Sequence, residues 1–260
     1  MNTKLLGEKT LSMIDQYKNF TVGKATCSIP YFNNKTIRAR GGLRVYGGKG
    51  SPKDIYDELL ARLTKDHVEV AVMTNENLKQ YLTDKNIGID CSGLTYYILD
   101  AESHERGLGQ LDKHLRFTKC KGIFGKIRCA LRPVENCDVK TFVDDKNSKV
   151  ISLDTVTPGD FIALIGDPTD TNSGSDRNHI LVIHQIEYQN FIPTRIHYTH
   201  TIAYPEDGVY GTGIKQGSIE ILDLQKNIAD NLWIEDGQSP ESLKNKVRKS
   251  QVEIRRLLWF

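Results

Sequence analysis

The chain has 260 residues, of which 38% are hydrophobic and 26% charged, and its formal net charge is +2. These values are typical of a soluble globular protein and exclude a disordered, collagen-like or coiled-coil chain. The longest apolar runs, residues 161–165 and 180–183, are far too short to cross a membrane. The length fits one elaborated domain, which we place over residues 1–260.

Helical patterns dominate the first half of the chain. Apolar side chains at near-helical spacing predict a helix over residues 3–20. Ser51 and Pro52 open a second predicted helix that ends near residue 64, because proline is favoured in a first helical turn. Further helices are predicted over residues 75–85, with Thr74 as the cap, and over residues 90–101.

Strand patterns follow in the second half. Short apolar runs predict strands at residues 150–153, 161–165, 179–188, 195–204 and 218–222, with a hairpin between the third and the fourth. A Ser-Pro-Glu sequence at residues 239–241 predicts a basic helix that runs to near Arg256. Residues 103–150 show no clear pattern. Helices followed by an antiparallel sheet indicate an α+β fold.

The five cysteines are odd in number and form no Cys-x-x-Cys pair; they are Cys27, Cys91, Cys120, Cys129 and Cys137. This excludes a closed disulfide framework and argues against a four-cysteine zinc site. At least one thiol is therefore free, which fits a reducing compartment. The first 20 residues lack the apolar stretch of a secretory signal. We expect a cytoplasmic protein, with export by a non-standard route as the alternative.

Cys91 has the most reactive setting of the five. It follows Asp90 and precedes Ser92 and Gly93, between a glycine-containing turn and an apolar helix, so its thiol falls at a helix N-terminus. The free backbone N–H groups and the helix dipole favour a thiolate there, and they can also hold an oxyanion. The alternative is a small, buried and unreactive cysteine.

A thiolate nucleophile needs a base, and His179 is the best candidate. It ends a polar loop, residues 166–178, and begins the apolar run 180–183, so its imidazole is placed to point into a cleft. His184 lies five residues further on and falls on the opposite face of the predicted strand.

Three segments in the same order resemble motifs of the NlpC family of papain-like cysteine peptidases. Asp-Cys-Ser-Gly-Leu at residues 90–94 resembles the nucleophile motif, Thr-Pro-Gly-Asp-Phe at 157–161 the turn before the histidine strand, and His-Ile-Leu-Val-Ile at 179–183 that strand. The resemblance implies a papain-like NlpC core of helices packed on an antiparallel sheet. We assign this core to residues 75–224, with an N-terminal extension, 1–74, a central addition, and a C-terminal extension, 225–260.

The resemblance implies Cys91 as nucleophile, His179 as general base, and a third polar residue on the next strand that orients His179. His197 and His200 both lie there, three positions apart, so they face opposite sides of the strand. We prefer His200, because the orienting histidine of the family often ends such a strand just before a turn. His197 is the alternative third catalytic residue.

The family also often places a tyrosine followed by glycines near the oxyanion, upstream of the cysteine. Tyr46, followed by Gly47 and Gly48, is a partial match, and Ser92 adjoins the nucleophile. Tyr46 lies further upstream than in compact members, so residues 51–85 are expected to be an insertion. The long gap before His179 makes residues 103–150 a second insertion.

These residues together predict a cysteine peptidase or amidase, which cleaves an amide bond through a Cys–His acyl-enzyme. The resemblance implies a peptide or peptidoglycan-fragment substrate and a bacterial or phage source. Two basic stretches, residues 35–53 and 113–132, would favour its carboxylates. Wall hydrolases act outside the membrane, so a cytoplasmic enzyme would act on recycled wall fragments. The alternatives are an amidase or acyltransferase on a non-wall substrate, and an inactive binding or structural module.

No metal or organic cofactor is expected, and neither membrane nor nucleic-acid binding. The glycines around Lys49 do not complete a phosphate-binding loop, because the required spacing to a Gly-Lys-Ser/Thr end is missing. Cys120, Cys129 and Cys137 have no nearby histidine pair that would complete a zinc site. The near-neutral chain shows no signature of a nucleic-acid-binding fold.

Overall fold

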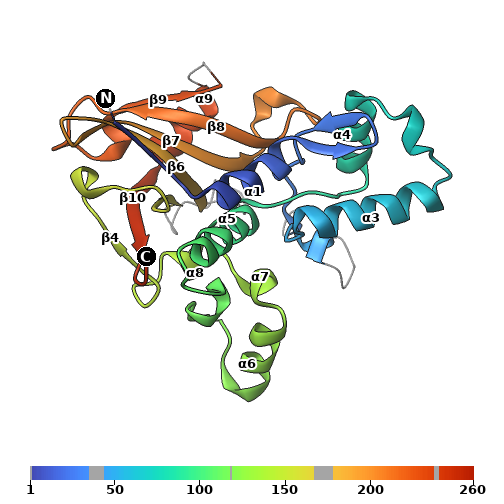
Figure 1. Cartoon of the computed structure of the whole chain (residues 1–260), viewed down its shortest axis with the longest axis horizontal. Helices are drawn as coiled ribbons and strands as arrows, with labels where there is room; N and C mark the ends of the chain where they lie inside the picture. The colour runs from blue at the N-terminus through green and yellow to red at the C-terminus, as the bar shows by residue number, and fades with distance from the viewer. Residues whose placement is uncertain (1, 35–43, 118, 167–177, 237–239) are drawn as a thin grey trace.

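The computed structural model describes residues 2–34, 44–117, 119–166, 178–236 and 240–260 (Figure 1). It confirms an α+β structure with helices on a large antiparallel sheet, whose strand order is β4-β10-β5-β6-β7-β8-β9 with β1 paired to β6. The strands of this sheet are β1 (Asn2–Leu5), β4 (Ser148–Val150), β5 (Phe161–Gly166), β6 (His179–Gln189), β7 (Ile192–Ile202), β8 (Gly213–Glu220), β9 (Leu232–Glu235) and β10 (Ser250–Leu257). A separate hairpin joins β2 (Phe20–Val22) and β3 (Ala25–Cys27).

The described helices are α1 (Glu8–Lys18), α3 (Pro52–Lys65), α4 (Asn75–Asp84), α5 (Cys91–Glu105), α6 (Gly122–Leu131), α7 (Pro133–Asn136), α8 (Val139–Phe142) and α9 (Glu241–Arg248). Short 3-10 turns lie at Arg44–Gly47, Val70–Val72, Leu111–Lys113, Leu153–Thr155, Pro205–Asp207 and Ile228–Asp230. Helix α5 packs against α1 and against β6 and β7, so it links the helical half of the chain to the sheet.

Side-chain caps explain why two predicted helices begin where they do. The Ser51 side chain accepts a hydrogen bond from the Asp54 N–H at the start of α3, and Asp54 accepts one from the Ser51 N–H in return. Thr74 accepts from the Asn77 N–H at the start of α4, as predicted. Each cap satisfies a backbone donor that the first helical turn leaves free.

The helix predicted over residues 3–20 begins only at Glu8. Residues 2–5 instead form β1, which pairs antiparallel with β6 and sets Leu5 opposite Gln185. The two elements are separated at Gly7, whose backbone is extended. The N-terminal extension therefore contributes a strand to the sheet of the predicted core.

The basic helix predicted to reach Arg256 is wrong beyond Arg248. Residues 250–257 form β10, which pairs with β4 and β5. The alternating burial of Val252 and Ile254 suits a strand whose apolar face covers a core. Arg256 donates to both oxygens of Asp160, so its charge has a partner within the sheet. Long-range pairing overrides the local helical pattern here.

The sheet separates two hydrophobic cores. Ile180 and Val182 of β6 belong to the first core, with Leu94 of α5 and the other N-terminal helices. Leu181 and Ile183 belong to the second core, which also contains Leu243 and Val247 of α9. Successive side chains of a strand point to opposite faces, so the two cores lie on opposite faces of β6. This division decides where the candidate site residues lie.

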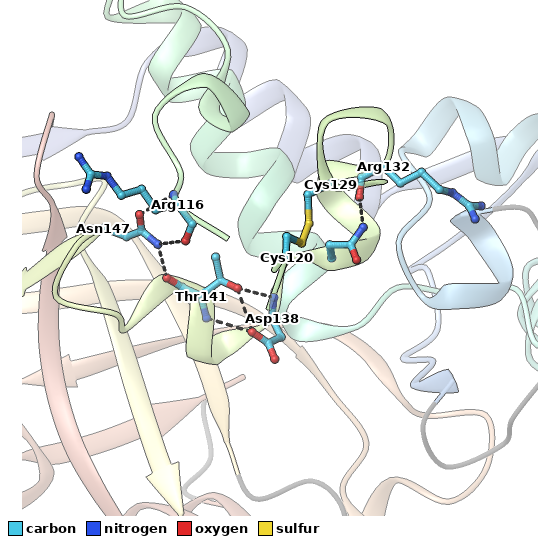
Figure 2. The surroundings of a disulfide bond; sticks show 8 residues. Arg116, Cys120, Cys129, Arg132, Asp138, Thr141 and Asn147 are labelled. Atoms are coloured by element: carbon cyan, nitrogen blue, oxygen red, sulfur yellow. Dashed lines mark hydrogen bonds between the residues drawn. A yellow bond between two sulfur atoms is a disulfide. The ribbon is translucent and has the colours of Figure 1, made fainter. Parts of the chain in front are cut away.

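Cys120 and Cys129 form a disulfide, with Cα atoms 6.3 Å apart, beside the polar contacts of Asp138 and Asn147 (Figure 2). Cys27, Cys91 and Cys137 are free, which confirms that at least one thiol is free. The sequence did not predict this bond. Disulfides are typical of oxidising compartments, so the cysteines no longer indicate a reducing one. Of the helices in the described part of the chain, none has the length and apolar character of a membrane span.

Candidate active site

Cys91 is the first residue of α5, where its thiol is buried at the helix N-terminus. The Asp90 side chain caps this helix and accepts a hydrogen bond from the Gly93 N–H at 2.6 Å. The predicted position of Cys91 at a helix start is confirmed. A carboxylate beside the thiol opposes thiolate formation, so its charge needs a counterion.

Lys49 supplies that counterion. Its ammonium group donates to Asp90 Oδ1 at 2.8 Å, to Ser92 Oγ at 2.6 Å and to the Cys137 carbonyl at 2.9 Å. All three ammonium donors therefore have acceptors, as a buried ammonium group requires, since Lys49 is only 5% exposed. The Lys49 charge offsets that of Asp90 and leaves the positive end of the helix dipole beside the thiol.

Sequence reasoning did not assign a role to Lys49. The glycines around Lys49 do not match a phosphate-binding loop, so the local sequence pattern gives the lysine no binding role. The signal that could have found it is a lysine inside an apolar and glycine-rich segment, next to the tyrosine–glycine match of the peptidase family.

The turn before Lys49 does border the start of α5. The Gly48 carbonyl accepts a hydrogen bond from the Asp90 N–H at 2.9 Å. Gly48 has a φ of +70°, and a Cβ there would lie 2.3 Å from the Phe32 carbonyl oxygen, so only glycine fits. This close approach brings the glycine pair predicted from sequence to the cap of the candidate nucleophile.

The hydroxyls of Tyr46 and Ser92, which were predicted to lie near the oxyanion, are both hydrogen-bonded to other side chains. The Tyr46 hydroxyl donates to Glu58 and accepts from Arg62 Nε of α3, the latter at 2.7 Å. The Ser92 hydroxyl donates to Asp90 Oδ1 at 3.0 Å and accepts from Lys49. Backbone N–H groups at the start of α5 are the remaining oxyanion donors of this segment.

His179 and His200 are brought together by the pairing of β6 with β7. His179 Nε2 lies 2.7 Å from His200 Nδ1, and His200 Nε2 lies 2.6 Å from Glu235 Oε2. All three side chains are buried. The structure places His197 elsewhere, because its Nε2 lies 2.7 Å from Glu187 Oε1. Opposite directions for His197 and His200 were predicted from strand alternation.

Glu235 was not predicted from sequence, since it lies on β9, 35 residues beyond His200. Its Oε2 also accepts from the Tyr198 and Tyr204 hydroxyls, at 3.4 and 3.3 Å. An acidic residue within the otherwise apolar Leu-Trp-Ile-Glu sequence of β9 is the signal that could have found it. Buried polar side chains of this kind usually have a partner.

The three groups define a direction for the protons. A carboxylate can only accept, so His200 donates to Glu235 through Nε2. In the tautomer of His200 that leaves Nδ1 without a proton, Nδ1 accepts and His179 donates to it through Nε2. Burial, with the charges of His200 and Lys246, holds the pKa of His179 well below its usual value. His179 is therefore neutral at neutral pH, with Nδ1 as a free base.

Cys91 and His179 lie at the same end of the sheet. β6 begins at His179, and the neighbouring β7 ends at Ile202, which pairs with Gly213 of β8. A Cβ on Gly213 would lie 2.5 Å from the Ile29 carbonyl oxygen, and the adjacent Pro30 carbonyl accepts from the Ile89 N–H. Residues 29–30 therefore connect this end of the sheet to the segment that enters α5.

The two residues differ in the face on which they lie. Cys91 packs in the first core, with Ile180 and Val182. His179 alternates with Ile180 along β6 and so shares the face of Leu181, in the second core. The described hydrogen bond of His179 is to His200. The structure thus assembles His179, His200 and Glu235 as one cluster, whereas Cys91 begins a helix that packs on the other face of the same sheet.

Comparison of the chain with protein-family models, with curated proteins and with solved structures finds no match. Among the described residues, no three histidine, cysteine, aspartate or glutamate side chains gather in a way that could hold a metal ion. The function of the chain is therefore inferred from the two clusters around Cys91 and His179.

Proposed function

We propose that the chain is a cysteine hydrolase of amide bonds on a papain-like NlpC core, with Cys91 as nucleophile, His179 as base and His200 as the orienting residue. The observation that carries the proposal is the bonded series from Glu235 through His200 to His179. This series fixes the His179 tautomer and presents Nδ1 as a proton acceptor.

The reaction has two steps. The Cys91 thiol loses its proton to His179 Nδ1 as Sγ attacks the amide carbonyl, and backbone N–H groups at the start of α5 hold the oxyanion. The C–N bond then breaks, and the imidazolium gives its proton to the leaving amine. In the second step His179 takes a proton from water, the hydroxide attacks the thioester, and the C–S bond breaks to release a carboxylate and the thiol.

The proposal makes a geometric demand. Sγ of Cys91 and Nδ1 of His179 must come within hydrogen-bond reach at the end of the sheet, where both residues lie. His179 is the first residue of β6, so only one flank of its backbone is held in the strand. This approach has to keep the bond between His179 Nε2 and His200 Nδ1, so the Cys91 thiol must reach the His179 ring across the end of the sheet.

We propose peptidoglycan-type peptides as the substrate class. Their stem carboxylates would be attracted by basic side chains such as Lys121, Lys126 and Arg128, which are exposed. A cytoplasmic enzyme would act on recycled wall fragments, whereas the Cys120–Cys129 disulfide favours an exported enzyme that acts on the wall itself.

The test is cleavage of stem peptides with D-amino-acid and diamino-acid linkages, with the released amines identified by mass spectrometry. We expect release by the native chain and a loss of about a thousandfold or more in Cys91→Ala and His179→Ala. His197→Ala is the matched control and should retain activity. Equal release by native chain and Cys91→Ala would contradict the proposal. Added hydroxylamine should divert part of the product to a hydroxamate through the acyl-enzyme.

A further inference from the structure

Helix α6 exposes an apolar face to solvent. Ile123 is 77% exposed, Phe124 88%, Ile127 51% and Leu131 71%. Large apolar side chains are usually scattered singly on a surface, so four on one short helix require an explanation. Figure 1 shows α6, in the middle of the 103–150 region, standing away from the sheet.

These four side chains share one side of the helix. At 3.6 residues per turn they fall within an arc of about 100°. Cys129 lies on the other side and is buried, bonded to Cys120 (Figure 2). The disulfide and the packing on α7 therefore hold α6 from behind and leave its apolar face outward. An isolated ten-residue helix is marginal in water, so this covalent support matters.

The charged residues of the segment that contains α6 have one sign, although Lys119 and Arg132 at its ends pair with Asp138 and Glu135. Residues 113–132 contain seven lysines and arginines and no acidic residue. Lys126 and Arg128 are exposed and flank the apolar arc on its two sides, and Lys121 is exposed at the start of the helix. An apolar stripe bordered by cations is the pattern of helices that lie in the interface of an anionic bilayer.

We propose that α6 docks on an anionic lipid surface, with Phe124 and its apolar neighbours inserted among the acyl chains and the flanking cations on the headgroups. This is binding to a membrane surface, which requires no membrane span. It revises the expectation of no membrane partner and does not depend on Cys91 or His179, but it uses the cations that are also proposed to attract substrate carboxylates. Nucleic acid would use the cations but would leave aliphatic Ile123, Ile127 and Leu131 in water. A second copy would meet the same positive charge.

The test is co-sedimentation of the full chain with vesicles of phosphatidylcholine alone and of phosphatidylcholine mixed with phosphatidylglycerol, at low and high salt. We expect binding to the mixed vesicles, loss of most binding at high salt, and little binding to the neutral vesicles. Absence of binding to the mixed vesicles, or equal binding to both kinds, would overturn the proposal.

Two pairs of variants assign the binding to α6. Phe124→Asp should reduce binding at least tenfold, whereas Phe191→Asp, at the exposed tip of the β6–β7 hairpin, should not change it. Lys126→Gln with Arg128→Gln should weaken binding about twenty-five-fold, at roughly fivefold per cation. Arg248→Gln with Lys249→Gln on exposed positions elsewhere should have little effect.

Three results would place the patch in another role and overturn the proposal. The first is equal vesicle binding by Phe124→Asp and Phe191→Asp. The second is a native chain that does not bind vesicles but self-associates in sedimentation, with the self-association lost in Phe124→Asp. The third is binding to single-stranded DNA that survives Phe124→Asp while vesicle binding is absent. Because Phe124 is exposed, its variant should keep the native thermal midpoint, which is measured alongside.

Discussion

The cap of α5 and the histidine series of the sheet are both buried polar clusters, but they are built differently. The cap joins the start of α5 to a lysine 41 residues upstream, with the Lys49 ammonium group between Asp90 and Ser92. The histidine series joins three strands and contains two rings and one carboxylate. The first cluster sets the electrostatic field at the thiol, and the second sets the tautomer of the base.

Because of this difference, a substitution in one cluster should affect folding stability and a substitution in the other should affect proton transfer. Removing a charge from the cap should cost folding free energy, because the partner charge stays buried. Removing the carboxylate from the histidine series should alter proton transfer, because both rings remain in place. Variants that separate stability from turnover therefore test the comparison.

The largest effect on stability is expected from Lys49→Met. It leaves Asp90 buried without its counterion, and we expect a loss of about 3 to 5 kcal/mol in the free energy of unfolding. Lys53→Met is the control, since Lys53 is 80% exposed on α3 and should leave the denaturant midpoint nearly unchanged. Adding Asp90→Asn to Lys49→Met should restore part of the loss. Equal midpoints for the two lysine variants would show that the ion pair does not hold the cap.

A smaller effect, on turnover rather than stability, is expected from Glu235→Gln. The amide can donate as well as accept, so His200 can adopt the other tautomer and no longer fix His179. We expect kcat to fall about a hundredfold with the thermal midpoint within a few degrees of native. Glu187→Gln, which faces His197, should keep native kcat. Similar kcat values for the two glutamate variants would show that Glu235 has no role in turnover.

A change of pH is a milder perturbation, and it tests His184, which lies on the face of β6 opposite to His179. Burial, with the charges of His197 and Lys18, lowers the pKa of His184 to about 4. The unfolded chain then binds more protons between that value and about 6.5. The contribution of His184 to stability should therefore be full above about pH 6.5 and fall by up to about 1.4 kcal/mol per pH unit below it, in addition to the fall from buried His179.

His184→Gln should make this decline shallower, because glutamine does not titrate and can still bond Thr199, which lies 3.0 Å from His184 Nδ1. His104→Gln, at an exposed position on α5, is the control and should leave the native profile unchanged. Urea unfolding at pH 7 and pH 5 measures both. An unchanged slope in His184→Gln would show that His184 does not carry the pH dependence.

Much of the local structure could be predicted from sequence, and the long-range structure could not. The helix starts at Ser51, Thr74 and Asp90 depend on caps that reach only three residues ahead. The strand at residues 250–257 depends on partners near residues 150 and 163, which leave no local signal.

The candidate site divides in the same way. Cys91, His179 and His200 stand in short motifs, and strand alternation separates His200 from His197. Lys49 and Glu235 were missed because their roles come from burial next to distant residues. The disulfide between Cys120 and Cys129 was missed because spacing alone does not reveal pairing.

The central claim, that the Cys91 thiol is activated by His179, is tested most directly by the rate of alkylation with iodoacetamide at neutral pH. Burial raises the pKa of Cys27 to about 11 and also raises that of Cys137, so both should react slowly. We predict that Cys91 reacts fastest of the three free thiols and slows at least tenfold in His179→Ala but not in His197→Ala. A Cys91 that reacts no faster than Cys27, or at the same rate in His179→Ala, would contradict the account.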